Sequence, residues 1–305
     1  MKQQNERESK MNKLPFYIVD VFAEEKYAGN QLAVVRNANT LSSGEMQRIA
    51  KEMNYSETTF ILSDKTQGGG YDVRIFTPEK ELPFAGHPTL GTAYVIQREI
   101  VKKLVDKIIL NLKVGQIPVN FNYGEEHADV LWMKQIQPTF GKTLEGLKIS
   151  QVLSLNQEDL DARFPIQEVS TGVFCFIVPL KTLGAVKRAK IARDRYFELV
   201  KDTQAKTMLI FCPETYSREN SFNVRVFADY YGVPEDPATG SANGCLAAYL
   251  VRHRYFGKDP IDVRVEQGYE MGRPSLLLLK AGETGEKIDV FVGGRVIMVA
   301  KGELV

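Results

Sequence analysis

The sequence is poor in several features that mark common classes of protein. It has only three cysteines, Cys175, Cys212 and Cys245, without a CxxC spacing, which argues against a disulfide framework or a zinc site. No apolar run approaches the roughly 20 residues of a membrane span. Lysine plus arginine (39) balance aspartate plus glutamate (38), so there is no basic excess for nucleic acid or a membrane surface. We therefore expect a cytoplasmic protein without nucleic-acid or membrane partners.

The usual cofactor and nucleophile signatures are also absent. The chain contains no GxxxxGK[ST] phosphate loop, no GxGxxG after a strand, no HExxH metal motif and no GxSxG elbow. Without these patterns, nothing supports a bound nucleotide, a metal site or a serine nucleophile. We expect the protein to work without a cofactor or a metal ion.

The segments that are present read as alternating strands and helices. The first ten residues, "MKQQNERESK", are polar and predict a disordered tail at 1–12. "FYIVDVF" and "NQLAVV" predict two strands, and "LSSGEMQRIAKEMN" predicts a helix that Ser42 and Glu45 begin as a capping box. After residue 260 four short strands are expected, the last two being "KIDVFVGG" and "RVIMVAKGEL".

An internal similarity gives the domain organisation. "VRIFTPEKELP" at 73–83 resembles "VRVFADYYGVP" at 224–234, with a constant offset of 151. In both places a turn of small residues and a helical pattern follow, "FAGHPTLGTAYVI" and "EDPATGSANGCLAAYLV". We expect two similar α+β lobes, one at 13–125, completed by a strand near 293–305, and one at 126–292.

A helix would begin directly after each repeated turn, and the free N–H groups at its N-terminus favour a small anion such as a carboxylate. Three polar side chains lie at or near such positions: Glu57 in "NYSETTF", His87 before Pro88, and Asp236 in "VPEDPATGS". Each has a simpler interpretation. Glu57 could be an exposed strand residue, His87 a helix cap with Pro88 at the first helical position, and Asp236 an N-cap.

Four longer motifs identify a family. "MQRIAKEMNYSETTF", "FAGHPTLGTA", "VPEDPATGSANG" and "QGYEMGRPSL" resemble the PhzF-like isomerases of phenazine biosynthesis, relatives of diaminopimelate epimerase. The resemblance runs from about Phe16 to the last strand. It implies the diaminopimelate-epimerase-like α+β fold, in which each of two lobes wraps a sheet around a central helix. It also implies a homodimer.

What the resemblance implies for the site can be stated by residue. The prototype reaction isomerises trans-2,3-dihydro-3-hydroxyanthranilate without a cofactor, and here Glu57 would move the proton from one ring carbon to another. Asp236 and His87 would share a proton network with the substrate. The implied catalytic residues are Glu57, His87 and Asp236, and the implied substrate-binding residues are Gly86, Gly240 and Ser241.

Two other functions remain open. An epimerase or racemase could use Glu57 and Asp236 as opposed bases. A racemase with two thiols is disfavoured, because the resemblance puts Gly86 and Asp236 where such relatives carry cysteines. A non-catalytic protein of the same fold that binds a small molecule is the other alternative.

Overall fold

The computed structural model describes residues 14–124 and 130–305, which fall into two compact units. Unit 1 combines the described residues up to Asp20 with Gln31–Val119 and Ile297–Val305. Unit 2 combines Val21–Asn30 with Asn120–Val296. The predicted tail at 1–12 lies outside the described residues.

Residues 21–30 were expected in the N-terminal lobe at 13–125, but they belong to unit 2 together with most of the lobe expected at 126–292. This segment packs with the later part of the chain because its backbone is bonded there. The Phe22 amide donates to the Arg295 carbonyl at 2.8 Å, and the Phe22 carbonyl accepts from the Leu276 amide at 2.9 Å. Further along, the Gly29 amide donates to the Pro274 carbonyl.

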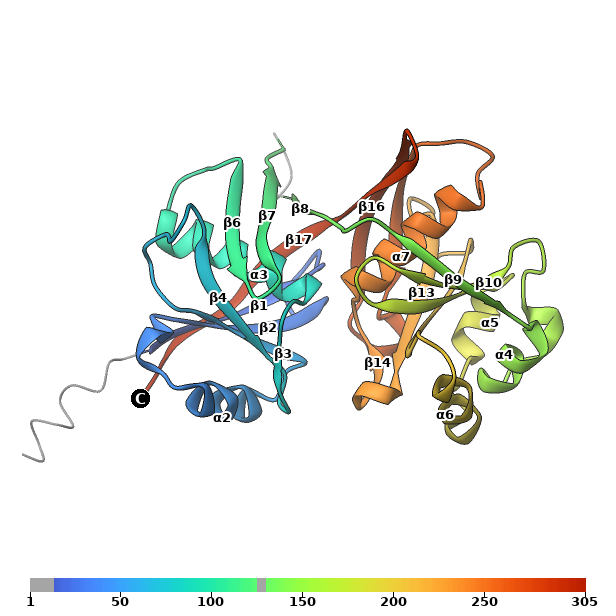
Figure 1. Ribbon diagram of the computed structural model, residues 1–305, viewed down its shortest axis with the longest axis horizontal. Coiled ribbons are helices and arrows are strands. Elements are labelled where there is room, and N and C mark those ends of the chain that lie inside the picture. Colours follow the sequence, from blue (N-terminus) through green and yellow to red (C-terminus); the bar gives the residue numbers. More distant parts are fainter. Residues whose placement is uncertain (1–13, 125–129) are drawn as a thin grey trace, which may run out of the picture. The chain divides into compact units, whose positions relative to one another are not determined.

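Unit 1 is built on a mixed sheet with one helix on each side (Figure 1). Its elements, in chain order, are β1 (Leu14–Val21), β2 (Asn30–Arg36), η1 (Ala38–Thr40), α2 (Ser43–Met53), β3 (Glu57–Ile61), β4 (Tyr71–Phe76), β5 (Glu81–Leu82), α3 (Gly86–Val95), the π-helical η2 (Ile96–Val101), β6 (Lys107–Leu112) and β7 (Gly115–Asn122).

The alternation of strand β3 explains how the sheet separates the two helices. Phe60 packs with Met46 and Ala50 of α2 in one apolar cluster. Thr59 faces the other way, and its hydroxyl lies 2.8 Å from that of Thr92 on α3. The predicted capping box is confirmed: Ser42 caps α2 and exchanges hydrogen bonds with Glu45.

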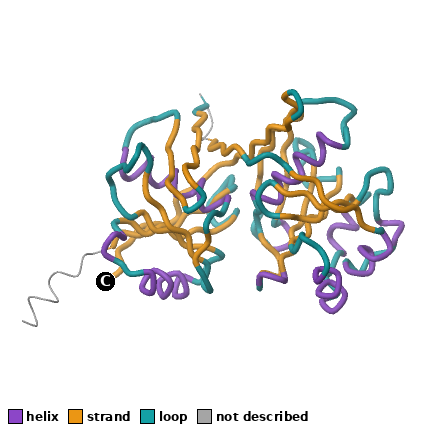
Figure 2. The backbone as a smooth tube through the Cα atoms, viewed as in Figure 1, coloured by secondary structure: helices purple, strands orange, loops and turns teal. Residues whose placement is uncertain are grey.

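Unit 2 is larger, and Figure 2 shows several short helices beside its strands. Its elements are β8 (Val130–Lys134), β9 (Thr139–Leu144), α4 (Gly146–Val152), η3 (Gln157–Asp159), β10 (Ile166–Ser170), β11 (Phe174–Pro179), α5 (Leu183–Arg188), α6 (Arg193–Lys201), β12 (Thr207–Cys212), β13 (Phe222–Ala228), η4 (Asp229–Tyr231), β14 (Val233–Asp236), α7 (Gly240–Arg252), β15 (Ile261–Gln267), η5 (Tyr269–Met271), β16 (Ser275–Thr284) and β17 (Lys287–Leu304). The two strands expected at the end of the chain are one continuous strand, β17, which runs on into unit 1.

The two units repeat one strand pattern. In unit 1, β2 and β3 are parallel, β3 and β4 antiparallel, and β4 and β6 parallel. In unit 2, β11, β12, β13 and β15 follow one another with the same directions. Each pattern surrounds a helix that is buried along nearly all its length, α3 in unit 1 and α7 in unit 2.

An arginine–glutamate pair is repeated with the strands. Arg74 binds Glu81 through two hydrogen bonds of 2.8 Å. Arg225 binds Glu235 in the same bidentate way, at 2.9 and 2.8 Å. The two arginines are 151 positions apart but the two glutamates are 154 apart. Unit 2 therefore carries three additional residues in this connection, where η4 forms.

No helix among the described residues is long and apolar enough to cross a membrane.

We expect Arg225→Met to lower the free energy of unfolding by roughly 3–5 kcal/mol, because it removes the partner of a largely buried carboxylate. The side chains of Arg225 and Glu235 are only 11% and 16% exposed. Urea unfolding measures the effect. The double variant Arg225→Met/Glu235→Leu should be less destabilised than Arg225→Met alone, and equal losses in the two would contradict a buried ion pair. Lys201→Met, in a pair that is mostly exposed, is the control and should change little.

Candidate active site

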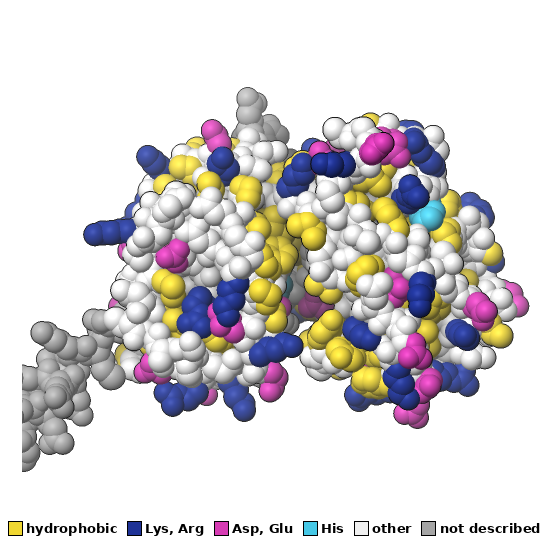
Figure 3. Space-filling model, viewed as in Figure 1, with side chains coloured by type: hydrophobic (Ala, Val, Ile, Leu, Met, Phe, Trp, Pro, Cys, Tyr) yellow, Lys and Arg dark blue, Asp and Glu magenta, His cyan; other side chains and the backbone are white. Residues whose placement is uncertain are grey.

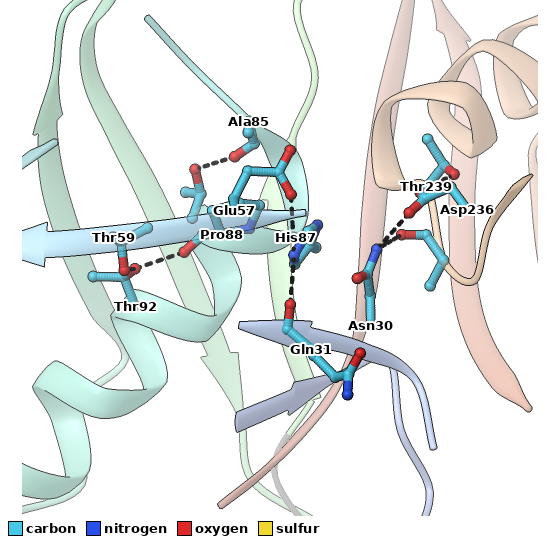
Figure 4. A network of polar contacts seen from close by, with 12 residues as sticks. Asn30, Gln31, Glu57, Thr59, Ala85, His87, Pro88, Thr92, Asp236 and Thr239 are labelled. Carbon is cyan, nitrogen blue, oxygen red and sulfur yellow. Dashed lines mark hydrogen bonds and ion pairs between the residues drawn. The ribbon is translucent and has the colours of Figure 1, made fainter. Parts of the chain in front are cut away.

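Glu57 is the first residue of β3, and its side chain points toward helix α3 (Figure 4). It lies on the same face of the strand as Thr59, which bonds to Thr92 of that helix. Its Oε2 atom is 3.5 Å from Nε2 of His87, and the side chain is only 17% exposed. The interpretation of Glu57 as an ordinary exposed strand residue is therefore wrong.

His87 is buried in unit 1, and burial lowers its pKa to about 3. The imidazole is thus neutral near pH 7, and the contact with Glu57 joins a carboxylate to an uncharged ring. Nε2 also lies 3.3 Å from the backbone carbonyl of Gln31. Because a carbonyl only accepts hydrogen bonds, we assign the proton of the neutral ring to Nε2.

Helix α3 begins one residue before His87. Its N-cap is Ala85, so His87 is the second helical residue and Pro88 the third, not the cap and the first residue as predicted. Ala85 has no side chain that could accept from the first turn. The Thr89 amide bonds to the Ala85 carbonyl, and Pro88 has no N–H. The amides of Gly86 and His87 are therefore the donors that this N-terminus offers to an anion.

Asp236 ends strand β14 in unit 2, and both of its carboxylate oxygens accept hydrogen bonds (Figure 4). Oδ1 accepts from Nδ2 of Asn30 at 2.9 Å, and Oδ2 accepts from the hydroxyl of Thr239. Burial raises the pKa of Asp236 to about 6, although the two hydrogen bonds oppose the shift. Asp236 is not an N-cap, because Thr239 occupies that position of α7.

The loop between Asp236 and α7 is held by side-chain amides. Gln267, the last residue of β15, donates to the Asp236 carbonyl at 2.7 Å and accepts from the Thr239 amide at 3.1 Å. The buried Asn243 donates to Gln267 and to the Thr239 carbonyl. Gly268 follows with φ 78°, and a Cβ there would lie 2.6 Å from the Pro237 carbonyl oxygen, so this close approach requires glycine.

The N-terminus of α7 resembles that of α3. Its N-cap, Thr239, makes no side-chain capping bond, because its hydroxyl is directed to Asp236. Gly240 is buried as the first helical residue, and Ser241 is the second and partly exposed. The Ser241 carbonyl accepts from the Thr171 hydroxyl at 3.3 Å. The first-turn amides and the Ser241 hydroxyl could hold a carboxylate.

The structure thus groups the predicted residues into two sets. Glu57, His87 and Gly86 lie together in unit 1, and Asp236, Gly240 and Ser241 lie together in unit 2. Asn30, Thr239 and Gln267 belong to the second set but were not predicted. Asn30 and Gln267 lie in "NQLAVV" and "QGYEMGRPSL", segments in which the sequence indicated no role for either residue.

Possible metal ligands, surface charge and the cysteine thiols complete the description of the site. Over the part of the chain that the structure describes, no three His, Cys, Asp or Glu side chains are grouped so as to hold a metal ion. Basic and acidic side chains are interspersed over the face drawn in Figure 3. The three cysteines are buried, and burial raises the pKa of the Cys245 thiol to about 11. A thiolate at that position is therefore disfavoured near pH 7.

Comparisons with known proteins agree on one family. The model of the phenazine biosynthesis-like protein family matches residues 19–302. The trans-2,3-dihydro-3-hydroxyanthranilate isomerase of Pseudomonas aeruginosa is 34% identical over 290 residues, which cover 94% of this chain and 98% of that protein. The crystal structure of a PhzF-family phenazine biosynthesis protein from Bacillus anthracis has a TM-score of 0.89 at 28% identity, covering 97% of this chain and all of that one.

A more distant likeness concerns the fold alone. A probable proline racemase from Agrobacterium radiobacter has a TM-score of 0.63 at 10% identity, covering 96% of this chain and 93% of that one. The predicted α+β class and the epimerase-like fold are therefore confirmed.

His87 and Asp236 predict opposite dependences of stability on pH. Only the unfolded chain protonates His87 between about pH 6.5 and 3, so its contribution falls as the pH falls. The folded protein keeps the Asp236 proton up to about pH 6, whereas the unfolded chain loses it near 3.8, so this contribution falls as the pH rises.

Urea unfolding between about pH 4 and 6 separates these two contributions. Relative to the wild type, Asp236→Asn should gain stability with rising pH, by up to roughly 1.4 kcal/mol per pH unit. His87→Gln should lose stability with rising pH over the same range. Changes of the same sign in the two variants would contradict the assigned protonation states.

Proposed function

Since the chain belongs to the phenazine biosynthesis-like family of isomerases, we propose that it isomerises a small carboxylate-bearing substrate by moving a proton with Glu57, without a cofactor. Trans-2,3-dihydro-3-hydroxyanthranilate, the substrate in the name of the Pseudomonas relative, is the first candidate. The observation that carries the proposal is the contact of a mostly buried Glu57 with a neutral His87.

A neutral histidine suits a general base. A protonated imidazole beside Glu57 would stabilise the carboxylate and weaken it as a base, whereas the neutral ring removes water without adding a charge. Nε2 of His87 lies 3.5 Å from Oε2 of Glu57, while its N–H group is directed to the Gln31 carbonyl. In our proposal packing against the imidazole ring orients the carboxylate, and the carboxylate takes the proton.

The proposed reaction conserves atoms and electrons. Glu57 removes a proton from one carbon of the substrate, and the electron pair of that C–H bond spreads into the adjoining double bonds. The same carboxyl then returns the proton to a different carbon, so a double bond has moved and nothing has been oxidised or reduced. The substrate carboxylate would bind amides of the helix N-termini, which also stabilise charge that develops in the transition state.

Asp236 and Ser241 are the further residues that the family resemblance implies in substrate binding. With Asn30 and Thr239 donating to it, Asp236 is arranged as an acceptor, which suits an ammonium or hydroxyl group of the substrate. The Ser241 hydroxyl and the Gly240 amide would hold the carboxylate. Only one strand acid serves as base in this proposal, since the position in β12 that corresponds to Glu57 is Thr207.

We expect Glu57→Gln to lower turnover by ~10²–10⁴-fold, because the variant keeps the shape of the side chain but cannot accept a proton from carbon. The assay is incubation with trans-2,3-dihydro-3-hydroxyanthranilate in D₂O, followed by NMR. Glu52→Gln, at an exposed glutamate of α2, is the matched control. An active Glu57→Gln variant would rule out this base. Deuterium at a stereocentre, with inversion and no shift of a double bond, would favour an epimerase.

The pH profile tests the role of Asp236. If its carboxylate form binds the substrate, kcat/KM should rise as the pH increases through about 6, where Asp236 loses its proton. Asp236→Asn should have a lower kcat/KM and lack this rise. A rise of kcat/KM that persists unchanged in Asp236→Asn belongs to another group.

A homodimer, expected from the family resemblance, stays a prediction that analytical ultracentrifugation tests.

A further inference from the structure

Asn30 has a buried side-chain amide that donates a hydrogen bond to the Asp236 carboxylate. Its side-chain nitrogen donates to Oδ1 of Asp236 at 2.9 Å (Figure 4). The same nitrogen donates to the Ala238 carbonyl at 2.9 Å. The residue is only 2% exposed. A carbonyl can only accept, so the atom beside Ala238 must be the NH₂ nitrogen, and the orientation of the amide is unambiguous.

The backbone before Asn30 is held by hydrogen bonds to Arg273 and Pro274. Arg273 donates to the carbonyls of Gly29 at 2.7 Å and Ala28 at 2.5 Å. The Gly29 amide donates back to the Pro274 carbonyl at 3.1 Å. Gly29 has φ 65°, and a Cβ there would lie 2.4 Å from the Val21 carbonyl oxygen. These contacts of Ala28 and Gly29 therefore fix the position of Asn30 independently of Asp236.

The two donors to Asp236 differ in what they permit. The Thr239 hydroxyl can rotate, so it can donate to a carboxylate or accept from a carboxylic acid. The Asn30 nitrogen can only donate, so Oδ1 must remain an acceptor in every protonation state. Protonation without loss of the Asn30 bond can therefore occur only at Oδ2, the oxygen that faces Thr239.

We propose that Asn30 is a positioning residue of the reaction, which keeps Oδ1 of Asp236 as an acceptor and directs any proton to Oδ2. The inference rests on the proposed function for its catalytic meaning. Its structural content, the link between Asn30 and the protonation of Asp236, can be measured without substrate.

Several neighbours besides Asn30 influence the Asp236 pKa, and the test must separate their effects from that of Asn30. Glu235 is the charged neighbour that raises the Asp236 pKa, and Arg225 holds it in a bidentate pair. Asn30 and Thr239 lower the Asp236 pKa. Asn243 offers a control, because it is a buried amide of the same network whose donors go to Thr239 and Gln267 and not to the carboxylate.

The experiment is a pH titration of the aspartate γ-carboxyl carbons by NMR, with the Asp236 signal identified by its loss in Asp236→Asn. In Asn30→Ala the pKa should rise from about 6 by about one pH unit, because a hydrogen bond to the charged form is lost. In Asn30→Asp, which keeps the shape of the side chain, the upper step of the coupled carboxyl pair should lie higher still. Asn243→Ala should leave the pKa of Asp236 near its wild-type value.

Kinetics supply the second readout. The rise of kcat/KM near pH 6 should move to higher pH in Asn30→Ala in parallel with the NMR pKa, so the variant's deficit should be larger at pH 6 than at pH 8. An Asp236 pKa that is unchanged in Asn30→Ala and Asn30→Asp, or one that rises equally in Asn243→Ala, would overturn the inference. The two proposals can fail separately. If the Asp236 pKa shifts in Asn30→Ala but the wild-type protein turns over no substrate, the proposed function is rejected and the link between Asn30 and Asp236 stands.

Discussion

The loss of water around two ionisable groups determines how the rest of the site is built. Burial keeps His87 uncharged and makes Asp236 harder to ionise than a free aspartate. Once water is removed, every remaining polar atom needs a partner from the protein, because an unsatisfied buried donor or acceptor is costly. The backbone carbonyl of Gln31 meets this need for His87, and Asn30 and Thr239 meet it for Asp236.

The two units share their strand directions but carry their acidic site residues at different positions. The strand directions and the arginine–glutamate pair are repeated, yet the strand position of Glu57 holds Thr207 in unit 2. In the β4–β5 pairing, Leu82 lies opposite Ile75, whereas in β13–β14 Asp236 lies opposite Val226. Each acid thus stands in one unit at a position where the other unit has a neutral side chain. An asymmetric reaction with a single base fits this division better than an exchange between equivalent groups.

Local patterns made much of the fold predictable. The capping box of α2 follows from short-range spacing and the strand β3 from composition, and the repeat of residues 73–83 at 224–234 indicated two similar units. Motifs also selected Glu57, His87 and Asp236. Their settings were harder to foresee, since the start of α3 differed from the prediction and Asp236 is not a cap.

What sequence reasoning missed depends on contacts between distant residues. Asn30 reaches Asp236 across 206 positions of the chain, and no local periodicity encodes such a pair. The pKa values depend on burial by neighbours from several elements, which a single stretch of sequence does not show. The placement of residues 21–30 with the later part of the chain has the same origin, because its hydrogen bonds go to residues beyond 270.

The course of β17 has a consequence for synthesis of the protein in the cell. Residues 297–305 belong to unit 1, and the ribosome makes them only after all of unit 2. Unit 2 has every one of its residues before unit 1 does, although most of unit 1 is translated first. Strand β1, which pairs with β17, therefore lacks this partner while the chain grows, and an unpaired strand edge invites pairing with other chains.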